Sequence, residues 1–132
     1  MIGLDTNLLV RYIIQDDPKQ SKIAERIIES NCTNENPGWI STIVLCEFVW
    51  VLQGAYNYSK ELIVSILYKL LSTSEIQVEN ASLVREALKI YEKESLDFSD
   101  ILIGCLNHSF ECSTTYTFDK KASKNKYFTL AS

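Results

Sequence analysis

Four carboxylates are the residues of this sequence best suited to chemistry: Asp5, Glu47, Asp100 and Asp119. Asp5 and Asp119 each follow a short run that predicts a strand, and Asp100 lies at the start of a predicted helix. In open parallel sheets, ligands bind beyond the carboxyl ends of the strands. Carboxylate oxygens suit hard divalent cations such as Mg²⁺ or Mn²⁺, which promote hydrolysis of phosphodiesters. The pattern therefore favours a metal-assisted phosphodiesterase.

Glu47 is the single charged residue in the apolar segment from Ile40 to Leu52. A helix that is apolar nearly all round is expected to be buried. An unpaired carboxylate in such a place is costly, so it needs a cation. We therefore expect Glu47 to lie beside a metal ion. A structural salt bridge to Lys or Arg, or exposure at the edge of the helix, are the alternatives.

Each aspartate also has a purely structural interpretation. Asp5 and Asp97 suit helix N-caps, and Asp100 would lie in a first turn, where the helix dipole favours a carboxylate. Asp119 suits a turn. Position alone does not separate the two interpretations for Asp5 and Asp119, whereas the cap suits Asp97 better and the functional role suits Asp100 better.

The elements that must position these acids alternate between strands and helices, the pattern of an α/β fold with a parallel sheet. The chain has 132 residues, without repeats or a linker, which predicts one domain over 1–132. Asp17, Ser59 and Asn80 are the expected N-caps of three of the helices. The expected strands are 1–5, 39–41, 76–78, 113–118 and 127–130, and the expected helices are 18–30, 42–53, 60–71, 81–93 and 98–108.

The net charge of −4 argues against a nucleic-acid partner, but the basic residues are unevenly distributed. Four lysines follow Asp119 and no acid does, which suits a polyanion beside an acidic pocket, although a solvated terminal segment is the alternative. One histidine (His108) and no paired cysteines make a zinc site improbable. No apolar run suits a membrane span and no secretory signal begins the sequence, so we expect a cytoplasmic protein with reduced cysteines. The four lysines are Lys120, Lys121, Lys124 and Lys126.

Four segments of the chain resemble the motifs of PIN-domain ribonucleases, in the same order and with similar spacing. The resemblance covers essentially the whole chain and is closest to the VapC-type toxins of bacterial toxin–antitoxin pairs. The segments are DTNLLVRY at 5–12 with QDDP at 15–18, LCEFVWVL at 45–52, DFSDILI at 97–103 and TYTFDKK at 115–121.

The resemblance implies a PIN-like three-layer α/β fold, in which helices flank a central parallel sheet. It also implies that the four acids are the catalytic and metal-binding residues for one or two Mg²⁺ or Mn²⁺ ions. Further motif positions are implied to be supporting residues, which orient the acids or bound water, or basic residues that bind substrate. The supporting residues are Thr6, Asn7, Asp97 and Thr117, and the substrate-binding residues are Arg11, Lys120 and Lys121.

Similar proteins are endoribonucleases that cut RNA, in many cases tRNA. They commonly form homodimers and are inhibited by a cognate antitoxin whose tail covers the acidic pocket. These properties are therefore our expectations for this chain. The alternative is a non-catalytic module whose acidic pocket binds a basic partner tail. Nothing in the sequence distinguishes RNA from DNA or identifies a target.

Overall fold

The computed structural model describes all 132 residues, which form two compact units, 1–81 and 82–132. Each unit contains its own all-parallel sheet, and helices flank the strands. The mixed α/β class expected from the sequence is confirmed. The two units are described separately below.

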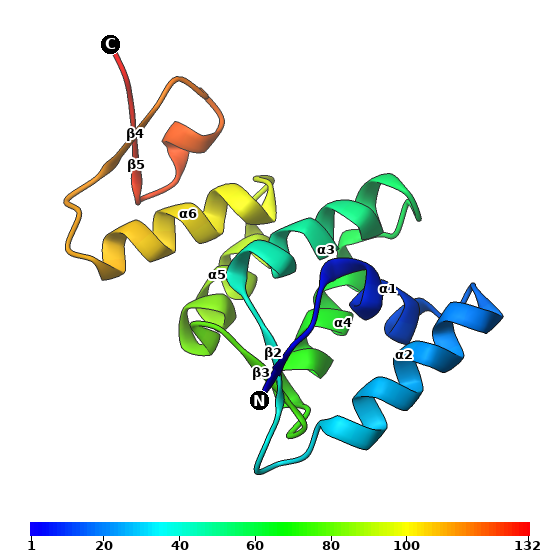
Figure 1. The fold of residues 1–132 in the computed structure, drawn as a ribbon. Helices are drawn as coiled ribbons and strands as arrows, with labels where there is room; N and C mark the ends of the chain where they lie inside the picture. Colours follow the sequence, from blue (N-terminus) through cyan, green and yellow to red (C-terminus); the bar gives the residue numbers. More distant parts are fainter. The chain divides into compact units, whose positions relative to one another are not determined.

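The first unit alternates strands and helices around a three-stranded sheet (Figure 1). Strand order is β1–β2–β3, with Ile2 opposite Gly38 and Gly38 opposite Ile76. Its elements are β1 (Ile2–Gly3), α1 (Thr6–Ile14), α2 (Pro18–Asn31), β2 (Gly38–Ile40), α3 (Thr42–Gly54), α4 (Lys60–Ser72) and β3 (Ile76–Val78).

The second unit pairs two strands beside a helix (Figure 1). Tyr116 lies opposite Thr129 in the parallel pair β4–β5. Its elements are α5, which begins at the boundary (Ala81–Lys93), α6 (Phe98–Ser109), β4 (Thr115–Thr117), the short 3₁₀ helix η1 (Ala122–Lys124) and β5 (Phe128–Leu130).

Local side-chain chemistry explains where several helices begin. Asp17, Ser41 and Ser59 each accept a hydrogen bond from a backbone N–H in the first turn of α2, α3 and α4, respectively. Pro18 then occupies the first position of α2, where no N–H is needed. The expected caps Asp17 and Ser59 are confirmed. Asn80 precedes α5 with φ of 54°, a left-handed conformation that Asn tolerates.

The strand expected over 1–5 is shorter in the structure, because α1 begins at Thr6. Asp5 therefore lies after a strand and directly before a helix at the same time. Its position alone therefore suits both interpretations left open by the sequence, a site residue at a strand end and a helix N-cap.

Close packing fixes α6 against β5. A Cβ atom on Gly104 would lie 2.7 Å from Phe128 Cε2 and 3.1 Å from Tyr127 Cβ. Only glycine permits this approach without displacement of its neighbours. The helix that carries Asp100 is thereby held on the sheet of its own unit.

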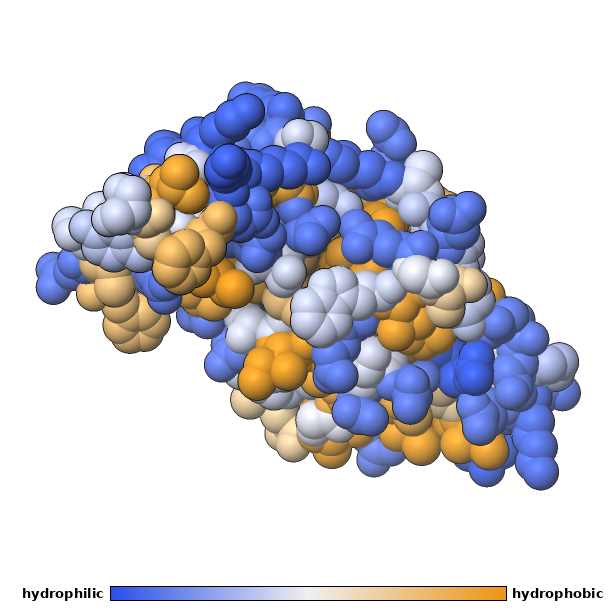
Figure 2. Space-filling model, turned by 90° about the horizontal axis from the view of Figure 1, so that it is seen from above, coloured by the Kyte–Doolittle hydropathy of each residue, from blue (hydrophilic) through white to orange (hydrophobic).

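Apolar residues fill the cores of both units, and several large ones remain exposed. Phe48, Leu52 and Ile63 are fully buried in the first unit, as are Phe98 and Leu102 in the second. Figure 2 shows hydrophobic side chains reaching the surface among hydrophilic ones on the face that it displays. No helix has the length and apolar character needed to cross a membrane. Among the exposed residues are Ile43, Trp50, Phe110, Tyr116 and Phe118.

Candidate functional site

The first unit holds Asp5 and Glu47, and Thr6 connects the helix after Asp5 to Glu47. Asp5 is exposed and precedes α1, but its side chain makes no capping hydrogen bond. Its carboxylate is therefore not used for helix capping. Thr6 is 7% exposed, and its hydroxyl donates to Glu47 Oε1 at 3.1 Å. The buried hydroxyl restrains the carboxylate of α3 beside the start of α1.

The expectation that Glu47 is buried is wrong. Glu47 is exposed, as are Ile43 and Trp50, which share its face of α3 at helical spacing. The opposite side of α3 supplies the core residues Leu45, Phe48, Val49 and Leu52. The apolar sequence of α3 therefore reflects a core face together with exposed apolar residues. Glu47 does not need a cation to offset burial.

The second unit brings Asp97, Asp100 and Asp119 within electrostatic reach of one another. Asp97 is the N-cap of α6 by position, yet its side chain makes no capping hydrogen bond. Asp100 lies in the first turn of the same helix and is half-buried. Partial burial raises the pKa of Asp100, and the negative charges of Asp97 and Asp119 raise it further. No basic side chain offsets this repulsion at Asp100.

Asp119 combines a position at the end of β4 with a structural role in the following turn. Its Oδ1 accepts hydrogen bonds from the backbone N–H groups of Lys121, at 2.8 Å, and Ala122, at 3.2 Å. Thr117 Oγ1 accepts a hydrogen bond from the backbone N–H of Asp119 at 3.0 Å. Oδ1 is thus held in the turn by two donors, whereas Oδ2 makes no protein hydrogen bond.

Arg11 contacts protein groups on three segments of the first unit. Its Nη1 lies 3.2 Å from Asp16 Oδ1 and donates to Tyr56 Oη at 3.3 Å, while Nε donates to Gln20 at 2.7 Å. Tyr56 donates in turn to Asp16 at 2.8 Å. These contacts support a structural role for Arg11, which joins α1, the loop before α2, α2 itself and the turn after α3.

The remaining predicted residues lie at the surface. Asn7 is exposed and lines a cavity of about 270 Å³, together with Leu8 and Arg11 among others. Lys120 and Lys121 are exposed directly after Asp119. His108 stacks on Tyr127 with ring centroids 4.6 Å apart, which suits the structural role expected of it.

Glu79 contributes to the local geometry and was missed by the sequence analysis. Its Oε1 accepts from both the backbone N–H of Thr42, at 2.9 Å, and the Thr42 hydroxyl, at 3.0 Å. The carboxylate therefore fixes the N-terminus of α3, the helix that carries Glu47. Glu79 directly follows β3, so the strand-end position that singled out Asp5 also pointed to it.

The acidic residues fit a hard divalent cation in the type and charge of their oxygen donors. Asp97 and Asp119 each repel Asp100, and a cation would relieve this repulsion. No group of three His, Cys, Asp or Glu side chains is already gathered as a set of metal ligands. The structure thus supports the chemistry of the donors but does not contain a preformed cage.

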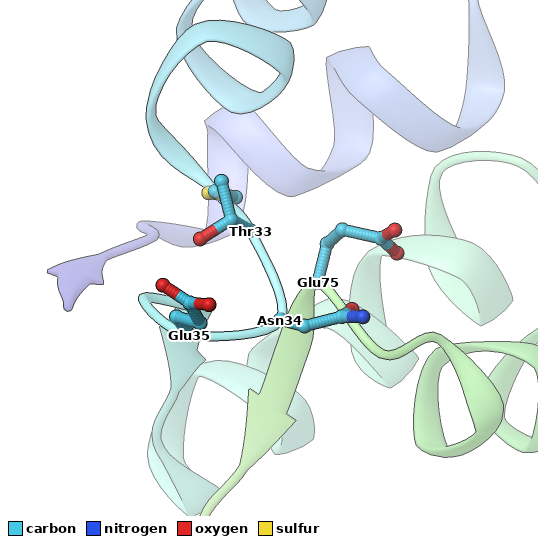
Figure 3. A pocket seen from close by; sticks show the side chains of 5 residues that line it. Thr33, Asn34, Glu35 and Glu75 are labelled. Atoms are coloured by element: carbon cyan, nitrogen blue, oxygen red, sulfur yellow. The ribbon is translucent and has the colours of Figure 1, made fainter.

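A cavity of about 480 Å³ lies at the other end of the first unit's sheet (Figure 3). Glu75 directly precedes β3, so this cavity faces the amino ends of the strands rather than their carboxyl ends. The carboxylates of Glu35 and Glu75 point away from each other (Figure 3). They do not converge on a common point as metal ligands would. The lining residues are Cys32, Thr33, Asn34, Glu35 and Glu75.

This chain has parallel strands with carboxylates at the strand ends. Residues 2–126 match the PIN domain family. The chain belongs to this family. A relative described as "VapC ribonuclease" from Aquifex aeolicus (strain VF5) is 27% identical over 127 residues, which cover 96% of this chain and 93% of the relative. No solved structure matches the chain. The resemblance inferred from the four motifs is confirmed.

Proposed function

We propose that this chain is a metal-dependent endoribonuclease that acts on cytoplasmic RNA as the toxin of a toxin–antitoxin pair. Residues 1–132 would act as one PIN domain. Membership of the PIN domain family and the ribonuclease relative support the nuclease assignment. The motif positions support Asp5, Glu47, Asp100 and Asp119 as the residues that carry it.

The observation that carries this proposal is the burial of Asp100 near two other carboxylates. Its carboxylate is half-buried, and burial raises its pKa, as do the negative charges of Asp97 and Asp119, which no basic side chain offsets. The N-terminus of α6 favours a carboxylate in its first turn, and a cation would in addition relieve the repulsion from Asp97 and Asp119. Carboxylates with shifted pKa values cluster at functional sites.

The proposed reaction is hydrolysis of an RNA phosphodiester. Water attacks the phosphorus, the bond to the 3′ oxygen breaks, and the products carry a 5′ phosphate and a 3′ hydroxyl. Mg²⁺ or Mn²⁺ would supply the positive charge that this hydrolysis needs, and motif position alone names the four acids as its ligands. The Thr6 hydroxyl would keep Glu47 oriented by donating to its carboxylate, and the Thr117 hydroxyl would keep Asp119 in place by accepting from the Asp119 backbone N–H.

Cleavage of bulk cellular RNA by the purified chain tests this function. We expect products in Mg²⁺ or Mn²⁺, none in EDTA, and 5′ phosphates at the new ends. Asp5→Asn removes one charge with almost no change in shape, so it should keep the fold and abolish most turnover. The matched control is Glu35→Gln, the same change at an exposed carboxylate on the far end of the sheet.

Two results would contradict the proposal. Equal activity of Asp5→Asn and wild type would show that the activity does not come from these acids. No metal-dependent cleavage by folded, inhibitor-free protein would instead favour the module that binds a basic partner tail.

The proposed partners follow from the same resemblance. We propose a homodimer and a cognate antitoxin whose basic side chain neutralises the acids. The absence of compensating cations around Asp100 supports a basic inhibitor, because such a group would relieve the same repulsion as a metal ion. Co-purification of a small basic-tailed protein that blocks cleavage would be the expected result when both are expressed together.

A further inference from the structure

Two aromatic side chains stand exposed on β4 and the residue after it. Tyr116 is 72% exposed and Phe118 is 88% exposed. Isolated exposed apolar residues are common and need no explanation. Two aromatic residues two positions apart, directly before Asp119 and two lysines, form a more specific pattern.

The packing of the second unit explains why Tyr116 points outward. Thr115 and Thr117 are half-buried, and Thr115 Oγ1 accepts a hydrogen bond from Asn107 Nδ2 of α6 at 3.0 Å. Successive side chains of a strand point to opposite faces, so Tyr116 lies on the face away from α6. Thr129, opposite Tyr116 on β5, is exposed as well.

The backbone on both sides of Phe118 is held in place. Thr117 accepts from the N–H of Asp119, and Asp119 accepts from the N–H groups of Lys121 and Ala122. The ring of Phe118 is therefore presented from a restrained turn. Such preorganisation lowers the entropic cost of binding.

The charge next to these rings suits a polyanion. Lys120, Lys121 and Lys124 are exposed, and no acid follows Asp119 in the chain. Exposed aromatic rings next to lysines are the elements with which proteins hold single-stranded nucleic acid, because bases stack on the rings while phosphates pair with the cations.

We propose that Tyr116 and Phe118 form a base-stacking platform for single-stranded RNA, with Lys120 and Lys121 holding its phosphates. This inference rests on the proposed ribonuclease function and adds the form of RNA that it takes. Phe118 binds an unpaired base next to Asp119. The chain thereby prefers loops and unpaired ends over duplexes.

The test measures RNA binding rather than cleavage. Fluorescence anisotropy of a labelled single-stranded oligoadenylate is followed in EDTA, so that no turnover occurs. Base–aromatic stacking is worth enough that Phe118→Ala should weaken binding by about tenfold, and Tyr116→Ala by somewhat less. Phe118→Trp keeps a stacking surface and should bind as tightly as wild type.

Phe110→Ala is the matched control. Phe110 is 80% exposed in the same unit, but it follows the C-terminus of α6, whereas Asp100 at the other end of that helix lies near Asp119. We expect the RNA affinity of Phe110→Ala to match that of wild type. Lys121→Gln should reduce the slope of log K against log salt by about one, whereas Phe118→Ala should leave the slope unchanged.

Three outcomes would overturn the platform: no binding by wild type, wild-type affinity of Phe118→Ala, or a loss shared equally by Phe110→Ala. Thermal unfolding followed by circular dichroism separates folding from binding. A large fall in Tm for both Phe118→Ala and Phe118→Trp would show that the ring packs within the folded chain, and would also overturn it. Phe118-dependent binding without any metal-dependent cleavage would contradict the nuclease and leave the platform intact.

Discussion

The two units hold their acids in different ways. The first unit has ten acidic and six basic residues, whereas the second has seven of each. Yet the repulsion among candidate acids is found in the balanced second unit, where burial raises the pKa of Asp100 and the charges of Asp97 and Asp119 raise it further. In the acidic first unit, Glu47 accepts a hydrogen bond from Thr6 and Asp16 pairs with Arg11.

This difference shows that net charge is a poor guide to where carboxylates repel one another. What matters is whether nearby carboxylates have partners of their own. In the first unit, Glu47 has a hydroxyl partner and Asp16 a guanidinium partner, whereas in the second unit Asp100 has neither. The overall charge of −4 therefore does not exclude a polyanionic substrate.

The largest expected effect is the loss of turnover when acids of the second unit are replaced. Asp100→Asn should lower turnover with RNA by about 100-fold or more, the loss typical when one group that stabilises the transition state is removed. Asp97→Asn should lower it by only about tenfold, the scale of a single charged hydrogen bond. Single-turnover cleavage at saturating Mn²⁺ measures both.

The ratio between these two variants tests the comparison. Equal losses would show that Asp97 is as important as Asp100, and the supporting role of Asp97 would be wrong. An active Asp100→Asn would show that the uncompensated carboxylates of the second unit do not serve catalysis.

A smaller effect is expected from the hydroxyl of Thr6 in the first unit. Thr6→Val keeps the buried shape but removes the donor to Glu47, so turnover should fall by about tenfold. Thr6→Ser keeps the hydroxyl and should retain most activity. Thr6→Val could lower both Tm and turnover, with Thr6→Ser restoring neither. That result would show that the side chain serves packing rather than orientation of Glu47.

Arg11 should affect stability rather than RNA binding. Arg11→Met removes its contacts with Asp16, Gln20 and Tyr56, which should lower the free energy of unfolding by about 1 kcal/mol, seen as a Tm lower by a few degrees. The salt dependence of RNA affinity should stay as in wild type, in contrast to Lys121→Gln. A reduced salt slope for Arg11→Met would restore the substrate-binding role that the motif implied.

Sequence patterns predicted most of the elements because their signals are local. Asp17-Pro18 and Ser59 begin helices through hydrogen bonds within four residues, so their neighbours in sequence are sufficient to locate them. The positions of Asp5 and Asp119 after strands were predicted from local sequence in the same way. The division into two parallel sheets depends on pairing between distant strands, which no local pattern contains.

The exposure of Glu47 could not be predicted because it depends on what covers α3. An apolar helix sequence does not reveal that Ile43 and Trp50 remain exposed beside Glu47. Likewise, the contact between Glu79 and Thr42 joins residues 37 positions apart. Both depend on tertiary packing rather than on spacing along the chain.

The smallest expected effect is on stability without metal. The pKa of Asp100 is raised in the folded chain, so its ionised form destabilises the fold once the pH exceeds the unfolded pKa, and this penalty disappears when the pH falls below both values. Asp100→Asn should therefore raise the free energy of unfolding by about 0.5 kcal/mol at pH ~7 in EDTA and leave it unchanged at pH ~3. Circular dichroism melts of both proteins measure this.

With Mn²⁺ present, wild type should be more stable than Asp100→Asn, because a cation that binds the folded chain stabilises wild type more than a variant lacking one carboxylate. The attraction between a first-turn carboxylate and the N-terminus of α6 opposes the repulsion. If Asp100→Asn instead lowers Tm at neutral pH in EDTA, the helix terminus outweighs the neighbouring acids. The second unit would then hold its carboxylates as securely as the first, and the contrast between the units would no longer point to a cation.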